Sequence, residues 1–591
     1  MIYRKPLYTL FLLLPLTFTS FSVALAQEKT SFPTLKTADG YYQHPVVKEL
    51  YLLMQVSGNK LKQVKEWDGK EIILDQKSET DFSDATGTYS LSLLKNSNNE
   101  VSGLKVGQEQ WTKVPGYTPE KMPVLSDTQV SEMLNQKAEQ LVSAINSNSL
   151  EVLTNFVNTN FSAALKSSME DQFLFRAKNA YRATGGVKFH KRLYFNAKAF
   201  FGEYQYASED LNNELEFSLK LDQEGKIKLY NNRLVYSADP VKKVSNAEAL
   251  VADLDQTLKR LAQKDVFSGV VLLAKGDRIL YESASGSAIK EAGIKNTLTT
   301  KFNLGSMNKM FTAVGIMQLV EQGKINLNDS VSKFLDSTWL PTALADQIKV
   351  SHLLNHSAGV GDFFNEKFLE SPVAQFRTLE GYKPFVKVSN LEFEPGTSWA
   401  YSNSGMLLLG AIIEKISGQN YFDYVQENIY KPAGMEDSAL RTFGGKEPGV
   451  PNPDGGTKTH QAVGYLPKID GSYETVSNSA FTTSSPAGGG YSTIADLHKF
   501  GVALLSDKLL RGSSKDKMFK DELGKSYGYG FQLSGSVEKQ VVGHAGGAPG
   551  VNAVTYIFPD SKYVIVVLSN YDRGATELGE YLLNQVKSIV K

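Results

Sequence analysis

The stretch Lys301–Val331 reads KFNLGSMNKMFTAVGIMQLVEQGKINLNDSV and contains Ser306, which is followed three residues later by Lys309. A short apolar run ends at Gly305, and apolar residues then recur at helical spacing until Gly323. This pattern predicts a long amphipathic helix with Ser306 and Lys309 in its first turn, where residues three apart share one face. A hydroxyl beside a desolvated amine at the positive end of a helix is a candidate activated nucleophile.

The spacing Ser-x-x-Lys is common and does not identify a catalytic pair by itself. The same spacing begins at Ser57, Ser92, Ser287 and Ser536. Ser306 is distinguished by its place at the start of the helical pattern and by two motifs further along the chain.

The composition limits the classes of function. A chain of 591 residues is too long for one core, so we expect about two to four domains. Lys plus Arg equals Asp plus Glu, at 63 each, and this zero net charge predicts no nucleic-acid partner. The sequence has no Cys, which excludes disulfides, a lipid-attachment cysteine and thiolate metal sites. An exported chain without disulfides fits a bacterial envelope.

The N-terminal residues 1–26 have the pattern of a secretory signal peptide. Arg4 and Lys5 form a basic start, an apolar run follows from Leu7 to Leu25, and Ala24–Ala26 has the small-x-small form of a cleavage site. We therefore expect a periplasmic or secreted protein. The alternative is an uncleaved membrane anchor, because the apolar run is nearly long enough to cross a bilayer.

Two smaller domains are expected before the long C-terminal segment. Residues 31–121 show short alternating runs such as TYSLSLLKNSNNEVSGLKV, with a turn at Asn96–Asn99, and predict a small β-rich domain with a helical piece near Val46–Met54. Residues 124–238 begin with helical patterns and end with a hairpin in LEFSLKLDQEGKIKLYNN, which predicts an α+β accessory domain. Its element order resembles the cone-shaped nuclear-transport-factor-like fold.

Residues 246–591 form the largest predicted domain. SGVVLLAKGDRILYESASG, starting at Ser268, reads as two strands, and VNAVTYIFPD and KYVIVVLSN near the end read as further strands before a closing helix. Strands at both ends with helices between them predict one antiparallel sheet flanked by helices, with edges from distant parts of the chain.

Two further motifs in this segment carry candidate chemistry. Tyr401 and Asn403 lie in PGTSWAYSNSG, on a loop that leads into a buried helix. A phenol beside an ammonium group can be pushed toward phenolate and act as a base, although Tyr-Ser-Asn is also common in turns. His544 and Gly546 lie in VVGHAGGAPG, where an apolar strand begins. A backbone N–H there, that of Gly547, is expected to form an oxyanion hole with that of Ser306.

The three motifs together resemble the signature of serine β-lactamase-like hydrolases: Ser306-x-x-Lys309, Tyr401-x-Asn403 and His544-x-Gly546. That group includes class C β-lactamases, D-alanyl-D-alanine carboxypeptidases, D-aminopeptidases and family VIII-type esterases. The resemblance extends to the sequence around the motifs, in the segments INLNDSV, HLLNHSAGV, PGTSWAYSNSG and AGGGYSTIADLHKF. The expected fold of residues 246–591 is therefore a β-lactamase/transpeptidase-like α+β domain.

The resemblance implies roles for individual residues. Ser306 is the implied acyl-forming nucleophile, and either Lys309 or Tyr401 accepts its proton. Tyr401 also protonates the leaving group and later activates water, while Asn403 binds the acyl side chain of the substrate and Lys309. The N–H groups of Ser306 and Gly547 supply the oxyanion hole.

The third motif departs from that of the family's β-lactamases, which carry Lys-Thr-Gly. His544 stands in place of the lysine that helps to hold the substrate carboxylate, and a histidine is mostly uncharged near neutral pH. This change favours esters, peptides or amides without a fixed carboxylate. His-x-Gly does occur among the family's esterases and aminopeptidases.

Other motifs give weaker hypotheses. His352 and His356 have the spacing of a zinc helix, but Leu353 replaces the glutamate of His-Glu-x-x-His, so we expect no metal and no cofactor. The glycines of residues 488–490 lack a phosphate-binding context and more simply let the chain pass close to the cleft before Ser492 or Thr493 caps a helix.

The sequence thus predicts an exported serine hydrolase that forms an acyl-enzyme on a small-molecule or peptide substrate, with a cell-wall peptide as one candidate. The first alternative is a penicillin-binding D-alanyl-D-alanine carboxypeptidase or a β-lactamase. The second is a non-catalytic penicillin-recognising sensor or scaffold, against which the intact Ser306, Lys309 and Tyr401 argue.

Overall fold

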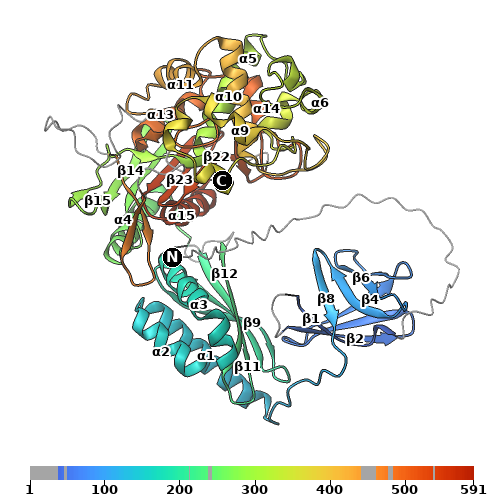
Figure 1. Ribbon diagram of the computed structural model, residues 1–591. Coiled ribbons are helices and arrows are strands. Elements are labelled where there is room, and N and C mark those ends of the chain that lie inside the picture. The colour runs from blue at the N-terminus through green and yellow to red at the C-terminus, as the bar shows by residue number, and fades with distance from the viewer. Residues whose placement is uncertain are drawn as a thin grey trace. The chain divides into compact units, whose positions relative to one another are not determined.

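The computed structural model describes residues 37–45, 50–211, 213–236, 243–440, 461–476, 483–536 and 539–590. The chain divides into two compact units, Met1–Glu120 and Lys121–Lys591 (Figure 1). The predicted signal peptide, residues 1–26, lies outside the described residues. Within the described ranges, no helix is both long and apolar enough to cross a bilayer.

The first unit is a closed antiparallel barrel in which β1 pairs with both β2 and β8. Its strands are β1 (Gly40–Gln43), β2 (Tyr51–Ser57), β3 (Lys60–Lys65), β4 (Glu71–Gln76), β5 (Asp81–Ser83), β6 (Ser90–Lys95), β7 (Val101–Val106) and β8 (Glu109–Lys113). The predicted turn at Asn96–Asn99 is confirmed, because it joins β6 to β7 and the Asn99 N–H donates to the Asn96 carbonyl.

The helix expected near Val46–Met54 is wrong in its described part. Tyr51–Ser57 form the strand β2, and residues 46–49 lie outside the described residues. Leu52 and Met54 are 2% and 0% exposed, so they alternate into the barrel at the two-residue period of a strand.

The second unit begins with three helices that are followed by a four-stranded antiparallel sheet. The helices are α1 (Asp127–Asn146), α2 (Leu150–Asn160) and α3 (Ala163–Thr184), and the strands are β9 (Val187–Asn196), β10 (Phe201–Ser208), β11 (Asn213–Leu221) and β12 (Ile227–Tyr236), in the order β12-β11-β10-β9. The helices share one hydrophobic core with the sheet. The order of helices before strands is confirmed, whereas the likeness to a nuclear-transport-factor-like cone stays a prediction.

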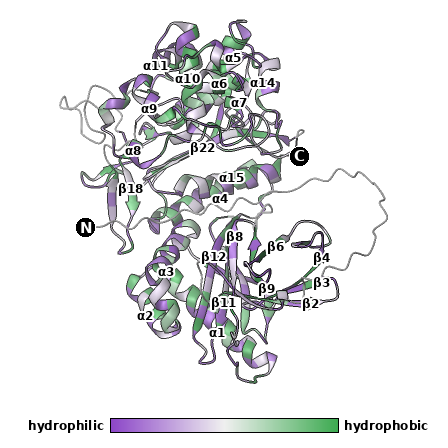
Figure 2. Cartoon of the chain, turned by 45° about the vertical axis from the view of Figure 1, so that its right-hand side comes forward, coloured by the Kyte–Doolittle hydropathy of each residue, from purple (hydrophilic) through white to green (hydrophobic). Residues whose placement is uncertain are grey.

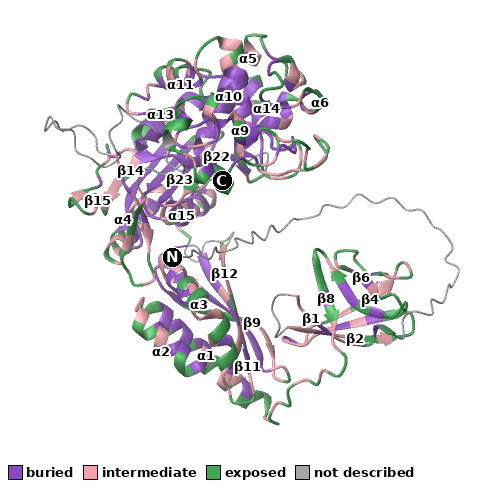
Figure 3. Cartoon of the chain, in the orientation of Figure 1, coloured by how far each residue is buried: buried purple, intermediate pink, exposed green. Residues whose placement is uncertain are grey.

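The rest of the unit is organised by a six-stranded antiparallel sheet. Its strands are β13 (Gly269–Lys275), β14 (Arg278–Ser285), β21 (Gln532–Ser534), β22 (Val541–Ala548), β23 (Val551–Ile557) and β24 (Tyr563–Ser569), in the order β14-β13-β24-β23-β22-β21. Gly269 pairs with Ser569, so the two ends of the domain lie side by side, as the sequence predicted. Figure 3 shows β22 and β23 as buried strands.

Both faces of this sheet are covered by helices. Along β13, Val270 and Leu272 face a core that includes α5 (Asn308–Glu321), α10 (Asn403–Ser417) and α13 (Ile494–Leu505). Val271 and Leu273 point to the other face, where α4 (Ala247–Gln263) and α15 (Gly574–Ile589) pack. The shorter described helices are α6 (Thr342–Ala345), α7 (Val350–Leu354), α8 (Glu366–Leu369), α9 (Lys383–Val386), α11 (Tyr421–Val425), α12 (Lys431–Ala433) and α14 (Gly512–Met518). This arrangement agrees with the expected helix-flanked antiparallel sheet.

The sequence predicted that the helix α5 would be amphipathic, but the structure shows that it is not. Every residue from Asn308 to Met317 is buried, so the helix lies inside the domain rather than on its surface. Its polar residues find partners there: Thr312 Oγ1 donates to the Pro486 carbonyl at 2.7 Å. α10 is equally buried over residues 404–413, and Figure 2 shows the hydropathy of both helices. A helix buried on all sides holds the residues of its first turn firmly.

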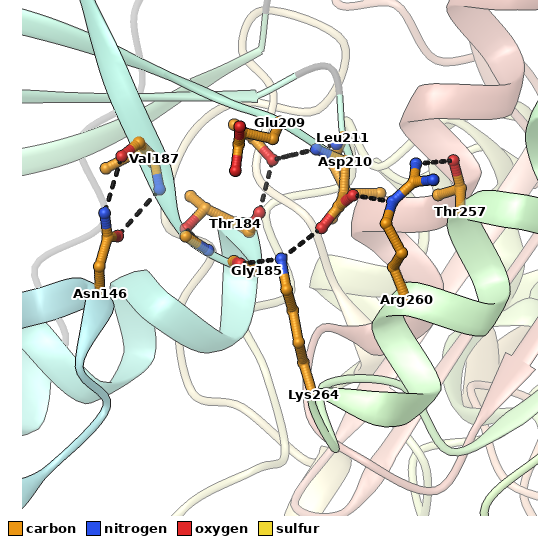
Figure 4. A network of polar contacts seen from close by, with 12 residues as sticks. Asn146, Thr184, Gly185, Val187, Glu209, Asp210, Leu211, Thr257, Arg260 and Lys264 are labelled. Atoms are coloured by element: carbon orange, nitrogen blue, oxygen red, sulfur yellow. Dashed lines mark hydrogen bonds and ion pairs between the residues drawn. The ribbon is translucent and has the colours of Figure 1, made fainter.

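The domain of α1–α3 and β9–β12 is joined to the domain of the six-stranded sheet by a buried carboxylate (Figure 4). Asp210, whose side chain is 2% exposed, bonds Arg260 Nε at 2.5 Å and Lys264 Nζ at 2.6 Å, both from α4. Lys264 Nζ also donates to the Gly185 carbonyl at the end of α3, at 2.6 Å. A second contact is made by Glu577 of α15, which accepts from Asn213 Nδ2 at 2.8 Å.

We expect Asp210→Ala to lower the free energy of unfolding by about 2 kcal/mol, because it leaves two cations without their buried partner. This loss is smaller than the largest losses seen when a buried ion pair is broken, because the side chains of Arg260 and Lys264 are 42% and 30% exposed and regain water. Urea denaturation measures the change. The matched control is Glu427→Ala, which breaks a surface pair with Lys431 and should change the value by less than about 0.5 kcal/mol. Equal effects of the two variants would contradict the prediction.

Candidate active site

Ser306 lies at the junction between a 3-10 turn and the buried helix α5. The turn η2 (Gly305–Met307) leads directly into α5, which begins at Asn308. Ser306 is partly exposed and borders a cavity, whereas Lys309 is fully buried in the first turn of the helix. The structure thus places Lys309 in the first turn of the predicted helix and Ser306 in the 3-10 turn directly before it.

Lys309 is held as a buried amine by two oxygen acceptors. Its Nζ donates to Asn403 Oδ1 at 2.7 Å and to the Ala487 carbonyl, and it lies 4.8 Å from the centre of the Tyr401 ring. Burial lowers the pKa of Lys309 from 10.5 to about 7, although the carboxylate of Asp362 opposes this shift. A large fraction of the amine is therefore neutral near pH 7 and able to accept a proton.

Tyr401 precedes α10, whose N-cap is Ser402. The Tyr401 hydroxyl is hydrogen bonded to Ser306, and this bond lowers the pKa of the phenol, but burial raises it more strongly, so the pKa lies above its usual value of 10. The phenol is thus protonated near neutral pH. The suggestion that a nearby ammonium would produce a phenolate is not supported, because desolvation outweighs every other influence on this ring.

Asn403 is the first residue of α10, and its side chain is oriented by a residue that the sequence motifs missed. Asp362 Oδ2 accepts from Asn403 Nδ2 at 2.8 Å and from the Asn403 backbone N–H at 3.3 Å. Of the two ends of the Asn403 side-chain amide, only the NH₂ group can donate to a carboxylate, so the amide oxygen is left to face Lys309. Asp362 follows HLLNHSAGV closely in the sequence, but its contact with the second motif appears only in the folded chain.

Glycines allow the strand β22 to approach the serine turn. A Cβ on Gly546 would lie 1.9 Å from the Leu304 carbonyl oxygen and 3.1 Å from the Ser306 nitrogen. A Cβ on Gly305 would lie 2.9 Å from the Gly547 nitrogen. The backbone nitrogens of Ser306 and Gly547 therefore border the same narrow space, and both residues line the cavity. Two N–H groups in this position are the candidate oxyanion hole.

Residues 488–490, which are all glycines, also bond to the backbone of the turn that carries Ser306. The Gly489 N–H donates to the Gly305 carbonyl at 3.1 Å, and the Leu304 N–H donates to the Gly490 carbonyl at 3.0 Å. Thr493 then caps α13, as the sequence indicated. These bonds hold the backbone at Leu304 and Gly305, the two residues directly before Ser306.

The structure places the His544 side chain beneath the site rather than in the cavity. The ring is 1% exposed, its Nδ1 donates to the Ala545 carbonyl at 2.6 Å, and its Nε2 accepts from the Tyr527 hydroxyl at 3.0 Å. Burial lowers the pKa of His544 to about 3, so the ring carries no charge near neutral pH. His544 is not among the residues that line the cavity beside Ser306, and its predicted substrate-binding role stays a prediction. Gly546 acts as a close-packed spacer.

His356 and Tyr527 complete a buried aromatic cluster behind Tyr401, which the sequence motifs did not indicate. The centre of the His356 ring lies 4.5 Å from that of Tyr401 and 4.6 Å from that of Tyr527. His356 Nδ1 accepts from the Ser402 N–H at 3.2 Å, while His352 Nδ1 accepts from the Lys349 N–H. The two histidines of the candidate zinc spacing thus have separate backbone partners. Among the described residues, no group of three or more potential metal-ligating side chains is present.

The cavity beside Ser306 has a volume of about 310 Å³. It is lined by Gly305, Ser306, Phe363, Phe364, Phe368, Tyr382, Tyr401, Asn403, Thr483, Ser485, Ala487, Gly488, Gly489, Gly547 and Ala548. Among these lining residues, all of them in the described part of the chain, none is Lys, Arg, His, Asp or Glu. The cavity therefore presents a hydroxyl nucleophile, a phenol and an amide within an apolar, uncharged recess.

Comparisons with known proteins place these features in a family context. The family model named Beta-lactamase matches residues 251–585. Penicillin-binding protein 4* of Bacillus subtilis (strain 168) is 31% identical over 354 residues, which cover 57% of this chain and 75% of that protein. The putative penicillin-binding protein PbpX of the same organism is 29% identical, covering 58% of this chain and 82% of its own. The crystal structure of a penicillin binding protein from Bacillus halodurans has 27% sequence identity and a TM-score of 0.48, covering 57% of this chain and 98% of its own.

Proposed function

Because the chain belongs to the Beta-lactamase family, we propose that it is a serine hydrolase that forms an acyl-enzyme on Ser306. The observation that carries this proposal is the buried amine of Lys309, whose pKa is about 7, beside a cavity that contains Ser306 and Tyr401. A neutral amine, a hydroxyl and a protonated phenol are the base, nucleophile and acid that acyl transfer requires.

In the proposed reaction, Ser306 Oγ attacks the substrate carbonyl and its proton passes to Lys309. Lys309 suits the role of base better than Tyr401, since burial favours the neutral form of both groups and only the amine accepts a proton in that form. The Tyr401 hydroxyl stays protonated and is the donor for the leaving group. In the second step, water attacks the ester of Ser306, the Tyr401 oxygen regains a proton from that water, and Lys309 returns its proton to Ser306 as the acid product leaves.

The tetrahedral intermediate places a negative charge on the former carbonyl oxygen. The N–H groups of Ser306 and Gly547 are the proposed donors to this oxygen, and the bonds that hold Gly305 keep them in place before the reaction. Asn403 is fixed between Lys309 and Asp362 and holds the amine in position. These residues act through geometry set before substrate arrives.

The proposed substrates are esters or amides without a carboxylate next to the scissile bond. The cavity lining contains no cationic side chain among the described residues, and the His544 ring is buried and uncharged. A second candidate function is a penicillin-binding carboxypeptidase or β-lactamase, which the names of the relatives favour. Its substrates carry a carboxylate, for which this cavity offers no ionic partner.

Labelling with a fluorophosphonate tests the proposal directly. The reagent should attach to one residue, and peptide mass spectrometry should identify it as Ser306. The purified protein should also hydrolyse p-nitrophenyl acetate faster than nitrocefin. Faster turnover of nitrocefin would instead support the β-lactamase reading. A protein that takes no label and turns over no ester would be the non-catalytic scaffold.

The proposal includes export to the cell envelope, with a cell-wall peptide as one candidate substrate. It rests on the basic and apolar start of the sequence and its Ala24–Ala26 site. N-terminal sequencing of the protein recovered outside the cytoplasm should begin at Gln27. A product that begins at Met1 and stays in the membrane fraction would indicate an anchor.

The pH dependence of ester hydrolysis should report the proton uptake by Lys309. With a pKa of about 7, the amine is protonated and inactive below pH 7 and neutral above it. We therefore expect kcat/KM to fall about tenfold for each pH unit below 7 and to level off above 7. Asp362→Asn should move the inflection to lower pH, because the carboxylate raises the pKa of Lys309. An inflection far above pH 7, in the direction in which burial moves the pKa of Tyr401, would assign the base to Tyr401 instead.

A further inference from the structure

One wall of the cavity beside Ser306 is made of three packed aromatic rings, Phe363, Phe364 and Phe368, which we call the aromatic wall. The rings of Phe363 and Phe364 are stacked with centres 4.5 Å apart. Phe368 meets both edge-on, at 4.8 Å from Phe363 and 5.1 Å from Phe364. Rings in these arrangements support one another and form a stiff apolar surface.

The three rings differ in their exposure. Phe363 and Phe368 are each 1% exposed and belong to the core, while Phe364 is 40% exposed. Phe364 is therefore the ring that presents apolar area at the cavity. Covering this area with a ligand removes it from water, which favours binding in proportion to the area covered.

The backbone that carries the aromatic wall is tied to the catalytic motif. The Phe364 N–H donates to Asp362 Oδ1 at 3.0 Å, and the other oxygen of the same carboxylate accepts from Asn403. Ser402 Oγ donates to the Gly361 carbonyl at 2.5 Å. The backbone that carries Phe364 is thus held at a fixed position relative to the Tyr401–Asn403 segment, which reduces the ordering cost of binding.

From this geometry, and resting on the proposed acyl-enzyme function, we propose that the site selects esters or amides whose acyl group is uncharged and aryl-sized, and that Phe364 determines this specificity. The acyl group is the part that stays on Ser306 through both half-reactions. A rigid recess beside the serine therefore acts on both steps when it holds that group. A cavity of about 310 Å³ with no ionic group in its described lining accommodates such a group and offers nothing to a charged one.

Two esters with the same leaving group test the proposal: p-nitrophenyl phenylacetate and p-nitrophenyl acetate. After correction for their rates of alkaline hydrolysis, the wild-type kcat/KM should favour phenylacetate by at least about tenfold. Phe364→Ala should reduce this ratio to near one, while Phe364→Leu keeps part of the preference. Fluorophosphonate labelling of Ser306 in each variant shows that the variant is folded.

Leu369→Ala is the matched control, since Leu369 ends α8 and is 43% exposed but does not line the cavity. It should keep the wild-type ratio. A wild-type ratio near one, or a ratio that Phe364→Ala leaves unchanged, overturns the specificity. So does equal turnover of an acyl group that ends in a carboxylate, such as p-nitrophenyl hemisuccinate. In these cases the proposed function stands as long as acetate is hydrolysed and Ser306 is labelled. Loss of both the label and all ester turnover overturns the function itself.

Discussion

Replacing Ser306 with alanine is expected to lower ester turnover by at least about a thousandfold and to abolish fluorophosphonate labelling. The variant removes the only group proposed to form the acyl bond, but it leaves the backbone N–H groups and the cavity in place. Some rate above that in water should therefore remain. Steady-state hydrolysis of p-nitrophenyl acetate measures the effect. Turnover at the wild-type level would remove Ser306 from the mechanism.

Ser92→Ala is a suitable control because Ser92 shares the Ser-x-x-Lys spacing with Lys95 but lies on a barrel strand of the other unit. It should leave ester turnover unchanged. The comparison separates the chemical role of Ser306 from the sequence pattern alone.

Lys309→Met extends this prediction. Methionine keeps a long apolar stem but removes the amine, so we expect a loss of at least about a thousandfold in turnover. The double variant with Ser306→Ala should be no slower than either single variant, because two residues that act as one unit give non-additive losses. Additive losses would show that the two side chains act in separate steps. Circular dichroism must accompany the measurement, since Asn403 and Ala487 lose a buried donor.

Gly546→Ala is expected to have the second large effect, a loss of at least about a hundredfold in turnover. The added Cβ would lie 1.9 Å from the Leu304 carbonyl oxygen, so the serine turn or the strand β22 must move. Either movement shifts the N–H groups of Ser306 and Gly547, which must converge on one oxygen. Overpacking of this kind should also lower the free energy of unfolding by about 1–3 kcal/mol.

Gly512→Ala is the control for this variant. Gly512 begins α14, and no atom lies within 4 Å of a Cβ added there. Its turnover and stability should match the wild type. Full activity in Gly546→Ala would show that the close approach of the two backbones is not needed for catalysis.

The sequence predicted the parts of the site that short motifs carry. Ser306 and Lys309 were expected together because helical spacing places residues three apart on one face, and the structure has them in two adjoining elements, η2 and the first turn of α5. The joining of strands from both ends of residues 246–591 into one antiparallel sheet was also expected, because strand patterns stand at both ends with helices between them. The amphipathic reading of α5 failed because its polar residues, such as Thr312, bond to loop carbonyls instead of water.

The residues that support the motifs were not predictable in the same way. Asp362, His356 and Tyr527 are separated in sequence from the groups they contact, and a lone Asp, His or Tyr has no periodic signature. In the sequence, nothing distinguishes Phe364 from other apolar residues. Only the folded structure shows that it lines the cavity. The motif gives the position of His544 on β22 but not the direction of its side chain, which the structure shows to be buried.

The pairing of Gly269 with Ser569 has a consequence for biosynthesis. The middle of the sheet stays incomplete until β24 has left the ribosome, because β13 has no neighbour on that side before then. The domain therefore closes late, and the pair β13–β14 lacks its inner neighbour while the chain is being made, so that apolar surface stays exposed to chaperones. A polypeptide that folds late is also still extended enough to pass through a translocation channel.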